Sequence, residues 1–131
     1  MAALDTNVVI RLLVGDDAAQ ASAAEKLVSA EPCTVSLSVL MECEWVLRAC
    51  YALKAPVIEA SFRDFLNLEH ITAADAVLAQ RVLDAYAKGL DFADALHAAQ
   101  CSEGQRFATF DKNFVQRAGK TGLRGVILLK T

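Results

Sequence analysis

The stretch Ala2-Ala-Leu-Asp-Thr-Asn-Val-Val-Ile-Arg-Leu-Leu13 decides the fold of this chain. Three small or apolar residues lead into an acid at Asp5, and the apolar residues that follow recur at the spacing of a helix: Val8, Val9, Leu12 and Leu13. This pattern predicts a short buried strand that runs directly into a helix. Strand–helix units of this kind build parallel sheets, which bind ligands at the carboxyl ends of their strands.

The same alternation continues along the chain. We expect further strands at 33–36, 69–72, 105–110 and 125–129, and helices over 16–28, 38–50, 57–67, 73–88, 92–102 and 112–117. Helices placed between short apolar strands predict an α/β fold of three layers, α/β/α, around a short, mainly parallel central sheet. A chain of 131 residues fits one core of ordinary size, so we expect a single domain over 1–131.

Composition excludes several classes of protein. With 55% hydrophobic and 22% charged residues the chain is neither disordered nor collagenous. No uncharged apolar stretch approaches the roughly 18 residues of a spanning helix, and an acid stands at position 5, where a signal peptide needs basic residues. We therefore expect a cytoplasmic protein with no membrane partner. The four cysteines form no CxxC pair, which favours reduced, buried thiols over a zinc site.

Charge is distributed unevenly. Residues 1–103 carry seven Lys/Arg against fifteen Asp/Glu, whereas 104–131 carry six against Asp111 alone. A basic end suits a phosphate backbone, and an acidic region beside it suits a cation. An ordinary solvated surface accounts for the same charges, so both interpretations stay open. The basic residues concerned are Arg106, Lys112, Arg117, Lys120, Arg124 and Lys130.

A few acids stand apart from the rest by position. Asp5 ends the first expected strand and Asp111 ends the fourth, so both project from the same edge of a parallel sheet. Glu42 lies on a mostly apolar stripe of its helix with no basic partner, which predicts a carboxylate turned inward. Glu44 has Arg48 four residues on, in the favourable order, which predicts a surface ion pair.

Asp91 and Asp94 lie one turn apart at the start of an expected helix. Asp91 is sufficiently explained as a helix cap, whereas Asp94 is surrounded by alanines that suit a close-packed site. Several carboxylates converging on one sheet edge repel each other unless a divalent cation lies among them. Oxygen-only ligands indicate Mg²⁺ or Mn²⁺ rather than zinc, and the candidates are Asp5, Glu42, Asp94 and Asp111.

Four stretches resemble, in order and spacing, a PIN-domain ribonuclease of the VapC toxin type. They are Asp5-Thr-Asn7, Ser36-Leu-Ser-Val-Leu-Met-Glu42, Asp91-Phe-Ala-Asp-Ala-Leu-His-Ala-Ala99 and Thr109-Phe-Asp-Lys-Asn-Phe114. The resemblance covers essentially the whole chain. It implies metal ligands at Asp5, Glu42 and Asp94, with Asp111 as the fourth and less constant acid. It also implies that Asn7 and Thr109 hydrogen-bond around these ligands.

The resemblance implies a function as well. A relative of this kind cleaves RNA internally with a metal-activated water, is silenced by a cognate antitoxin protein, and forms a homodimer. Two alternatives stay open: a PIN-like domain that binds without catalysis, and an aspartyl phosphotransferase of the haloacid-dehalogenase type. The latter needs a second Asp where this chain has Asn7. We expect His97, Trp45 and the phenylalanines to be packed residues rather than catalytic or base-stacking ones.

Overall fold

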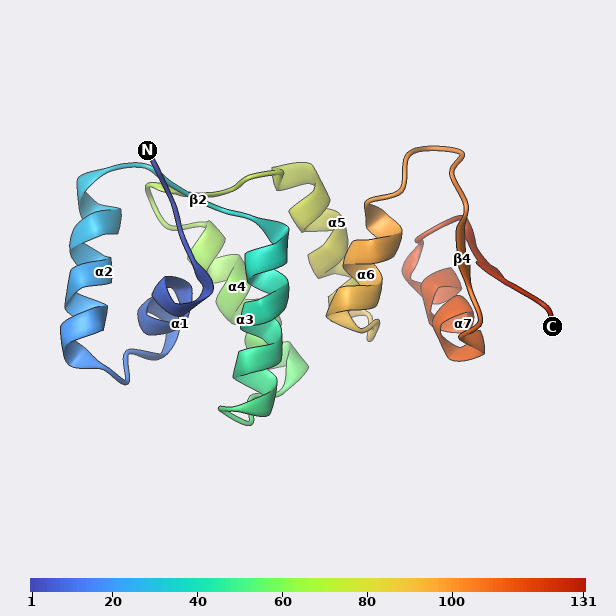
Figure 1. The fold of residues 1–131 in the computed structure, drawn as a ribbon, viewed down its shortest axis with the longest axis horizontal. Coiled ribbons are helices and arrows are strands. Elements are labelled where there is room, and N and C mark those ends of the chain that lie inside the picture. The colour runs from blue at the N-terminus through green and yellow to red at the C-terminus, as the bar shows by residue number, and fades with distance from the viewer. The chain divides into compact units, whose positions relative to one another are not determined.

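The computed structural model describes residues 1–131. They form two compact units, Met1–Ala76 and Val77–Thr131, and each is described by itself. Strands and helices alternate along both units, as the sequence predicts (Figure 1). The α/β class and the short, parallel strands are therefore confirmed.

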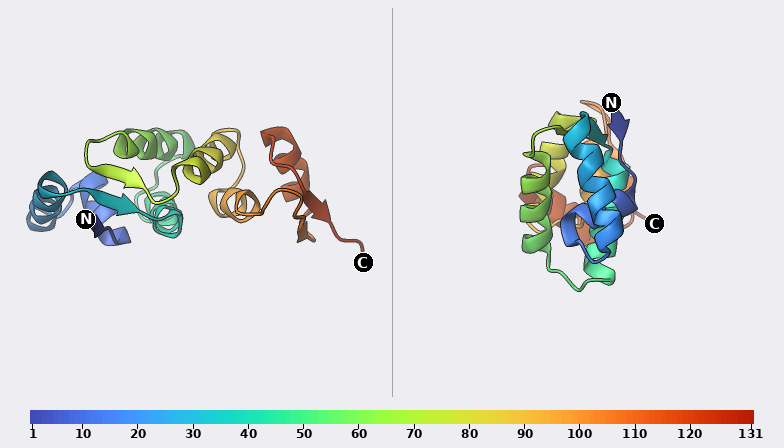
Figure 2. Two further views of the ribbon diagram at one scale, coloured as in Figure 1. Left: turned by 90° about the horizontal axis from the view of Figure 1, so that it is seen from above. Right: turned by 90° about the vertical axis from the view of Figure 1, so that its left-hand side faces the viewer.

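The first unit contains a three-stranded parallel sheet. Its elements are β1 (Ala2–Ala3), α1 (Thr6–Val14), α2 (Ala18–Ala30), β2 (Cys33–Val35), α3 (Leu37–Ala49), α4 (Ala55–Leu66) and β3 (Ile71–Ala73). The strand order is β1-β2-β3 (Figure 2). Cys33 pairs with Ala2 on one side and with Ile71 on the other. Parallel neighbours need long crossovers, and each crossover here contains two helices.

Large apolar side chains from α1, β2, α3 and α4 fill the core of this unit. Helix α1 contacts α2 and α3, and α4 contacts α3 and β3. The largest side chains that are almost fully enclosed are Phe62, Leu40, Leu47, Ile58, Val9 and Val35. These contacts fix α1 beside α3, so that side chains from both helices face a common space.

The second unit contains two parallel strands and three helices. Its elements are α5 (Ala76–Ala87), which starts at the boundary residue, α6 (Phe92–Ala99), β4 (Phe107–Thr109), α7 (Lys112–Thr121) and β5 (Val126–Leu128). Strand β4 pairs with β5, with Phe107 opposite Val126. Phe92 is fully buried and meets the ring of Tyr86 edge-on, with 5.3 Å between the ring centres. None of the helices in either unit is long and apolar enough to cross a membrane.

Several predicted boundaries were wrong by a few residues, for local reasons. Helix α5 begins at Ala76 instead of 73, because Thr72 and Ala73 belong to β3. Helix α4 begins at Ala55, one residue before Pro56, because a proline fits the first turn of a helix. Helix α7 continues to Thr121, where Gly122 adopts the left-handed conformation that commonly ends a helix.

Candidate active site

Asp5 lies at the carboxyl end of β1 and forms the N-cap of α1. Its carboxylate accepts a hydrogen bond of 2.7 Å from the backbone N–H of Thr6. A carboxylate in this position is favoured by the helix dipole. The side chain is otherwise exposed and has no ion pair, so it remains available to a ligand.

Glu42 faces the same cavity as Asp5. This cavity, of about 560 Å³, is lined by α1 and α3 and also contains Asn7, Ile10 and Val46. Cys43 Sγ lies buried behind it, 3.9 Å from the carbonyl oxygen of Thr6. Burial, followed by the charges of Glu42 and Asp5, raises the pKa of the Cys43 thiol to about 12. The negative charges of both carboxylates are therefore felt in one small region of the first unit.

The predicted burial of the two glutamates on α3 was wrong. Glu44 is the buried one, with a side chain only 5% exposed, because Arg48 Nε and Nη2 donate to its carboxylate at 2.9 and 3.3 Å. An ion pair with two hydrogen bonds allows a charge to be buried. Glu42 is exposed toward the cavity, and Trp45 is 55% exposed rather than packed in the core. Because Glu42 lines the cavity, it is nevertheless a candidate metal ligand.

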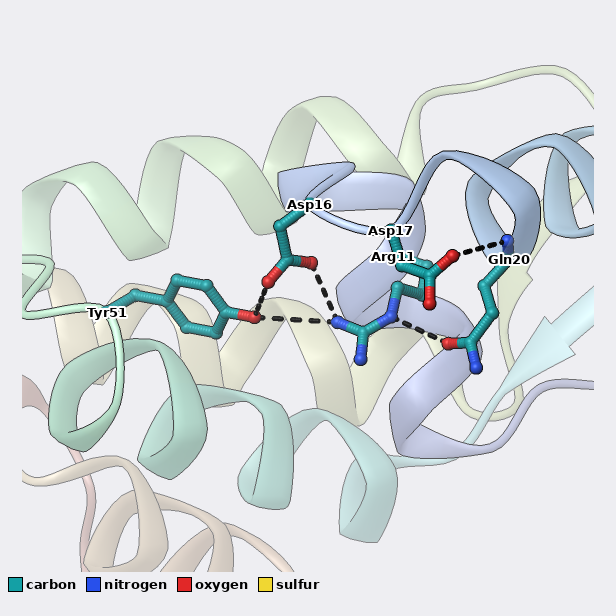
Figure 3. Close-up of polar contacts among 5 residues, drawn as sticks. All are labelled: Arg11, Asp16, Asp17, Gln20 and Tyr51. Atoms are coloured by element: carbon teal, nitrogen blue, oxygen red, sulfur yellow. Dashed lines mark hydrogen bonds and ion pairs between the residues drawn. The ribbon is translucent and has the colours of Figure 1, made fainter.

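A second polar cluster lies at the other end of the same cavity, and sequence reasoning missed it. Arg11 Nη1 donates to Asp16 at 2.8 Å, and its Nε donates to the side-chain oxygen of Gln20 at 2.8 Å (Figure 3). Tyr51 donates its hydroxyl to Asp16 at 2.7 Å and accepts from Arg11 Nη1 at 3.5 Å. The one available signal was the spacing of Asn7 and Arg11, which places both on one face of α1.

This cluster shifts the pKa values of its members consistently. The hydrogen bond from Tyr51 is the main cause that lowers the pKa of Asp16, and the same bond raises the pKa of Tyr51. The contact with Tyr51 is also the main cause that raises the pKa of Arg11. At neutral pH the cluster therefore holds a charged guanidinium, a carboxylate and a neutral phenol.

In the second unit, Asp91 and Asp94 take the places that the sequence predicted. Asp91 is the N-cap of α6, and its carboxylate accepts from the backbone N–H of Asp94 at 3.2 Å. Asp94 is half-buried in the first turn. Burial, followed by the charges of Asp91 and Asp111, raises the pKa of Asp94, and His97 partly offsets this. Asp94 thus lies in the negative field of two other acids of its unit.

Asp111 follows β4 and forms the N-cap of α7. Its carboxylate accepts from the backbone N–H of Phe114 at 3.1 Å, and its own N–H donates to the Thr109 hydroxyl at 3.0 Å. Thr109 therefore fixes the turn that presents Asp111. His97, expected to be packed, is exposed and stacks on the ring of Phe107, with 6.4 Å between ring centres.

The cysteines only partly fulfil the expectation of buried thiols. All four are free; Cys33 and Cys43 are buried, Cys101 is half-buried and Cys50 is exposed. Cys50 lines the cavity of the first unit, two turns along α3 from Glu42. Its exposure follows from its position as the C-cap of α3, where the helix ends.

The predicted site residues thus form two groups, one in each unit. Asp5 and Glu42, with Asn7, share a cavity in the first, and Asp94 and Asp111, with Asp91 nearby, interact in the second. Neither unit brings together three or more His, Cys, Asp or Glu side chains that could hold a metal ion. The donors of each group are carboxylates, the ligand type that hard divalent cations prefer, so their chemistry fits Mg²⁺ or Mn²⁺.

A comparison of the sequence with models of known families gives a match. The model of the PIN domain matches residues 2–120. The chain belongs to the PIN-domain family. No curated protein and no solved structure matches it significantly. The PIN domain is in general a nuclease fold, and the match includes Asp5, Glu42, Asp94 and Asp111.

Proposed function

We propose that this PIN domain is a metal-dependent endoribonuclease that acts as the toxin of a toxin–antitoxin pair. The observation that carries the nuclease activity is the cavity shared by Asp5 and Glu42. Neither carboxylate has an ion-pair partner, so two negative charges face one space without compensation. Such a pair favours binding of a cation over coexistence of two free charges.

The candidate ligands are Asp5 and Glu42 from the first unit and Asp94 and Asp111 from the second. A Mg²⁺ or Mn²⁺ ion held by these carboxylates would lower the pKa of a coordinated water and would polarise a phosphoryl oxygen. Asn7 lies in the cavity to hydrogen-bond around the first pair, and Thr109 fixes the turn of Asp111. Burial, followed by the charges of Asp91 and Asp111, raises the pKa of the half-buried Asp94, so a positive charge nearby would favour its ionised form.

Cleavage of a labelled single-stranded RNA tests the nuclease activity. We expect products with Mg²⁺ or Mn²⁺ and none with EDTA. Glu42→Gln keeps the shape and removes the charge, and should lower kcat/KM more than about 100-fold, the upper limit for residues that only support a ligand. Glu69, whose side chain is 94% exposed, provides the matched control Glu69→Gln, which should retain full activity. Cleavage that persists in EDTA, or in Glu42→Gln, would contradict the proposal.

The toxin assignment rests on the resemblance of the four motifs and has its own test. Induced expression should arrest growth of the host, and Asp5→Asn should relieve the arrest. A cognate antitoxin, with a basic side chain that reaches the acidic cavity, should do the same on co-expression. If the wild-type protein cleaves RNA but does not affect growth, the nuclease activity is supported and the toxin role is contradicted. Light scattering of the purified protein tests the proposed homodimer.

The alternatives predict different results. A PIN domain used only for binding retains RNA without producing fragments under any metal. A phosphotransferase of the haloacid-dehalogenase type transfers phosphate through an aspartyl intermediate, for which Asn7 takes the place of the required second Asp. The PIN-family match argues against this second alternative.

A further inference from the structure

The cavity of the first unit is a groove with two chemically different ends. One wall comes from α1 and the other from α3 and the residue after its cap. Asp5 and Glu42 form the acidic end. Arg11 lies six residues beyond Asp5, about 9 Å along the helix axis. Cys50 lies eight residues beyond Glu42, about 12 Å along α3, and Tyr51 follows it. Arg11 and Tyr51 therefore form the opposite end.

The floor between the two ends is apolar. Ile10 and Val46, one from each helix, line the groove between the carboxylates and the guanidinium. Neither offers a hydrogen bond, so a ligand that spans the groove is held by polar groups at its ends. A nucleic acid strand matches this pattern, because it carries charged phosphates at regular intervals with less polar parts between them.

Arg11 is held in one orientation while part of its guanidinium stays free. Its Nε is bound to Gln20 and its Nη1 to Asp16 and Tyr51, whereas Nη2 has no protein partner (Figure 3). Gln20 is itself fixed, because its backbone N–H donates to Asp17 at 3.0 Å. A guanidinium with fixed geometry and free donors is suited to bind a phosphate.

We propose that the Arg11–Tyr51 end of this groove is a subsite for a phosphodiester of the RNA strand, next to the one that is cleaved. Arg11 donates from Nη2 to the phosphate oxygen. Asp16 and Tyr51 are positioning residues, which hold the guanidinium through Nη1. This inference rests on the proposed nuclease function, because it takes the acidic end of the groove as the cleavage site.

A purely structural role for Arg11 makes a different prediction. In that case the ion pair only fastens the turn between α1 and α2 to the end of α3, and breaking it from either side has the same effect. For a phosphate subsite the two substitutions have opposite effects on RNA binding. Arg11→Gln removes the charge that binds the phosphate, whereas Asp16→Asn removes a negative charge that competes with the phosphate. Comparing these two variants therefore separates the roles.

Binding of a fluorescent single-stranded RNA is measured by anisotropy, with Mg²⁺, in a Glu42→Gln background that prevents cleavage. We expect Arg11→Gln to raise Kd about tenfold, as loss of a charged hydrogen bond implies. It should also reduce the slope of log K against log salt by about 0.7, the loss of one phosphate contact on a single strand. Asp16→Asn keeps a side-chain oxygen that can accept from Arg11 Nη1 but removes the negative charge, so it should leave Kd unchanged or lower it. Arg63→Gln, which breaks an ion pair on α4 away from the groove, should have no effect.

Equal increases in Kd for Arg11→Gln and Asp16→Asn would overturn the subsite in favour of the structural role. An unchanged Kd and slope for Arg11→Gln would overturn it as well. Thermal unfolding checks that each variant folds. If Arg11→Gln does not fold, Arg11→Lys replaces it, because Lys keeps the charge without the fork and should still weaken binding.

The outcomes for the subsite and for the nuclease are distinguishable. If the Glu42→Gln protein binds RNA with the expected dependence on Arg11 but the wild type cleaves no RNA, the subsite is supported and the proposed nuclease activity is contradicted. Wild type that cleaves RNA, with binding insensitive to Arg11→Gln, retains the nuclease and contradicts the subsite. No measurable RNA binding by the parent protein contradicts the subsite whatever the cleavage result.

Discussion

Asp91 and Asp94 lie one turn apart on α6, yet their carboxylates do different things. Asp91 accepts a backbone hydrogen bond at the helix end, whereas Asp94 is half-buried in the field of Asp91 and Asp111. The first arrangement stabilises the helix, and the second is unfavourable until a cation is present. The sequence predicted the cap at Asp91 from its place before the helix, and the contacts in the structure confirm it.

Asp94→Asn should not destabilise the metal-free protein and should abolish cleavage. Because the folded-state pKa of Asp94 is raised, the support of this group for folding is complete below its unfolded pKa and is lost as pH rises through the folded pKa. The relative gain in stability from Asp94→Asn should therefore grow toward neutral pH. Adding Mn²⁺ should reverse the order, since the cation stabilises the wild-type fold by binding it. Thermal unfolding at several pH values, with chelator and with Mn²⁺, measures both effects.

Asp91 is the matched control for this prediction. Asp91→Ala removes the cap of α6 and should cost about 1 kcal/mol, whereas Asp91→Asn should cost much less. Neither change should remove the response to Mn²⁺. If Asp91→Asn abolishes that response and Asp94→Asn destabilises the metal-free protein, the two assignments are reversed.

The glutamates of α3 show a limit of prediction at the residue scale. Glu44 with Arg48 four residues on is the pattern of an exposed helix pair, but the same pair also allows Glu44 to be buried. The spacing of Glu44 and Arg48 predicts their ion pair. It does not predict whether the pair faces the core or the solvent, because this depends on the elements that pack against α3. Glu42 lines the cavity that Asp5 shares, although its burial was predicted wrongly, and its role as a metal ligand stays a prediction.

At the scale of elements, the alternation of strands and helices was predictable, because apolar periodicity and caps are local signals. Asp5, Asp17, Asp91 and Asp111 all cap the helices that follow them. Helix ends were less predictable. The last turn of α7 is polar, and only the positive φ of Gly122 shows where the helix stops.

Two glycines near β5 provide a paired prediction on these elements. Gly125 has φ 84°, and a Cβ there would lie 3.0 Å from the backbone oxygen of Gln105. Gly125→Ala should therefore destabilise the protein by more than about 1 kcal/mol. Gly119 is helical in α7 with open space around it, so Gly119→Ala should stabilise by about 0.5–1 kcal/mol. Urea unfolding compares the two variants, and a similar change in both would contradict this account.

At the scale of the whole molecule, charge separates the two units. Residues 1–76 carry five Lys/Arg and eleven Asp/Glu, whereas 77–131 carry eight and five. The net charges are therefore −6 and +3. The second unit therefore carries the excess of basic residues, and their role as a contact for phosphates stays a prediction.

Charge removal at Lys112, Arg117, Lys120 and Arg124 should weaken RNA binding and its dependence on salt. The slope of log K against log salt should decrease by about 0.7 for each phosphate contact that is lost on a single strand. Replacement of four exposed acids, Glu25, Asp64, Glu69 and Glu103, by their amides serves as a control for surface changes. An unchanged slope in the fourfold basic variant would assign these residues to an ordinary solvated surface.

The four acids could be singled out from their places at strand ends and on helices, but which of them lie close together could not be predicted from the sequence. Asp5 and Glu42 are 37 residues apart in the chain, and Asp94 and Asp111 belong to other elements again. Periodicity describes each helix and strand but carries no information about which side chains share a cavity. The Arg11–Asp16–Tyr51 cluster depends on a contact between residues 40 apart, and it could not be predicted for the same reason.

Cys43 lies directly behind the two carboxylates of the first unit, and its high pKa has a consequence for the chemistry of oxidants. With a pKa of about 12, only about one thiol in a hundred thousand is ionised at pH 7. Since peroxides attack thiolates, burial passivates Cys43, and the charges of Glu42 and Asp5 add to this effect. Cys50 is exposed at the far end of the groove. Oxidants would therefore reach Cys50 first and leave the sulfur behind the acidic end intact.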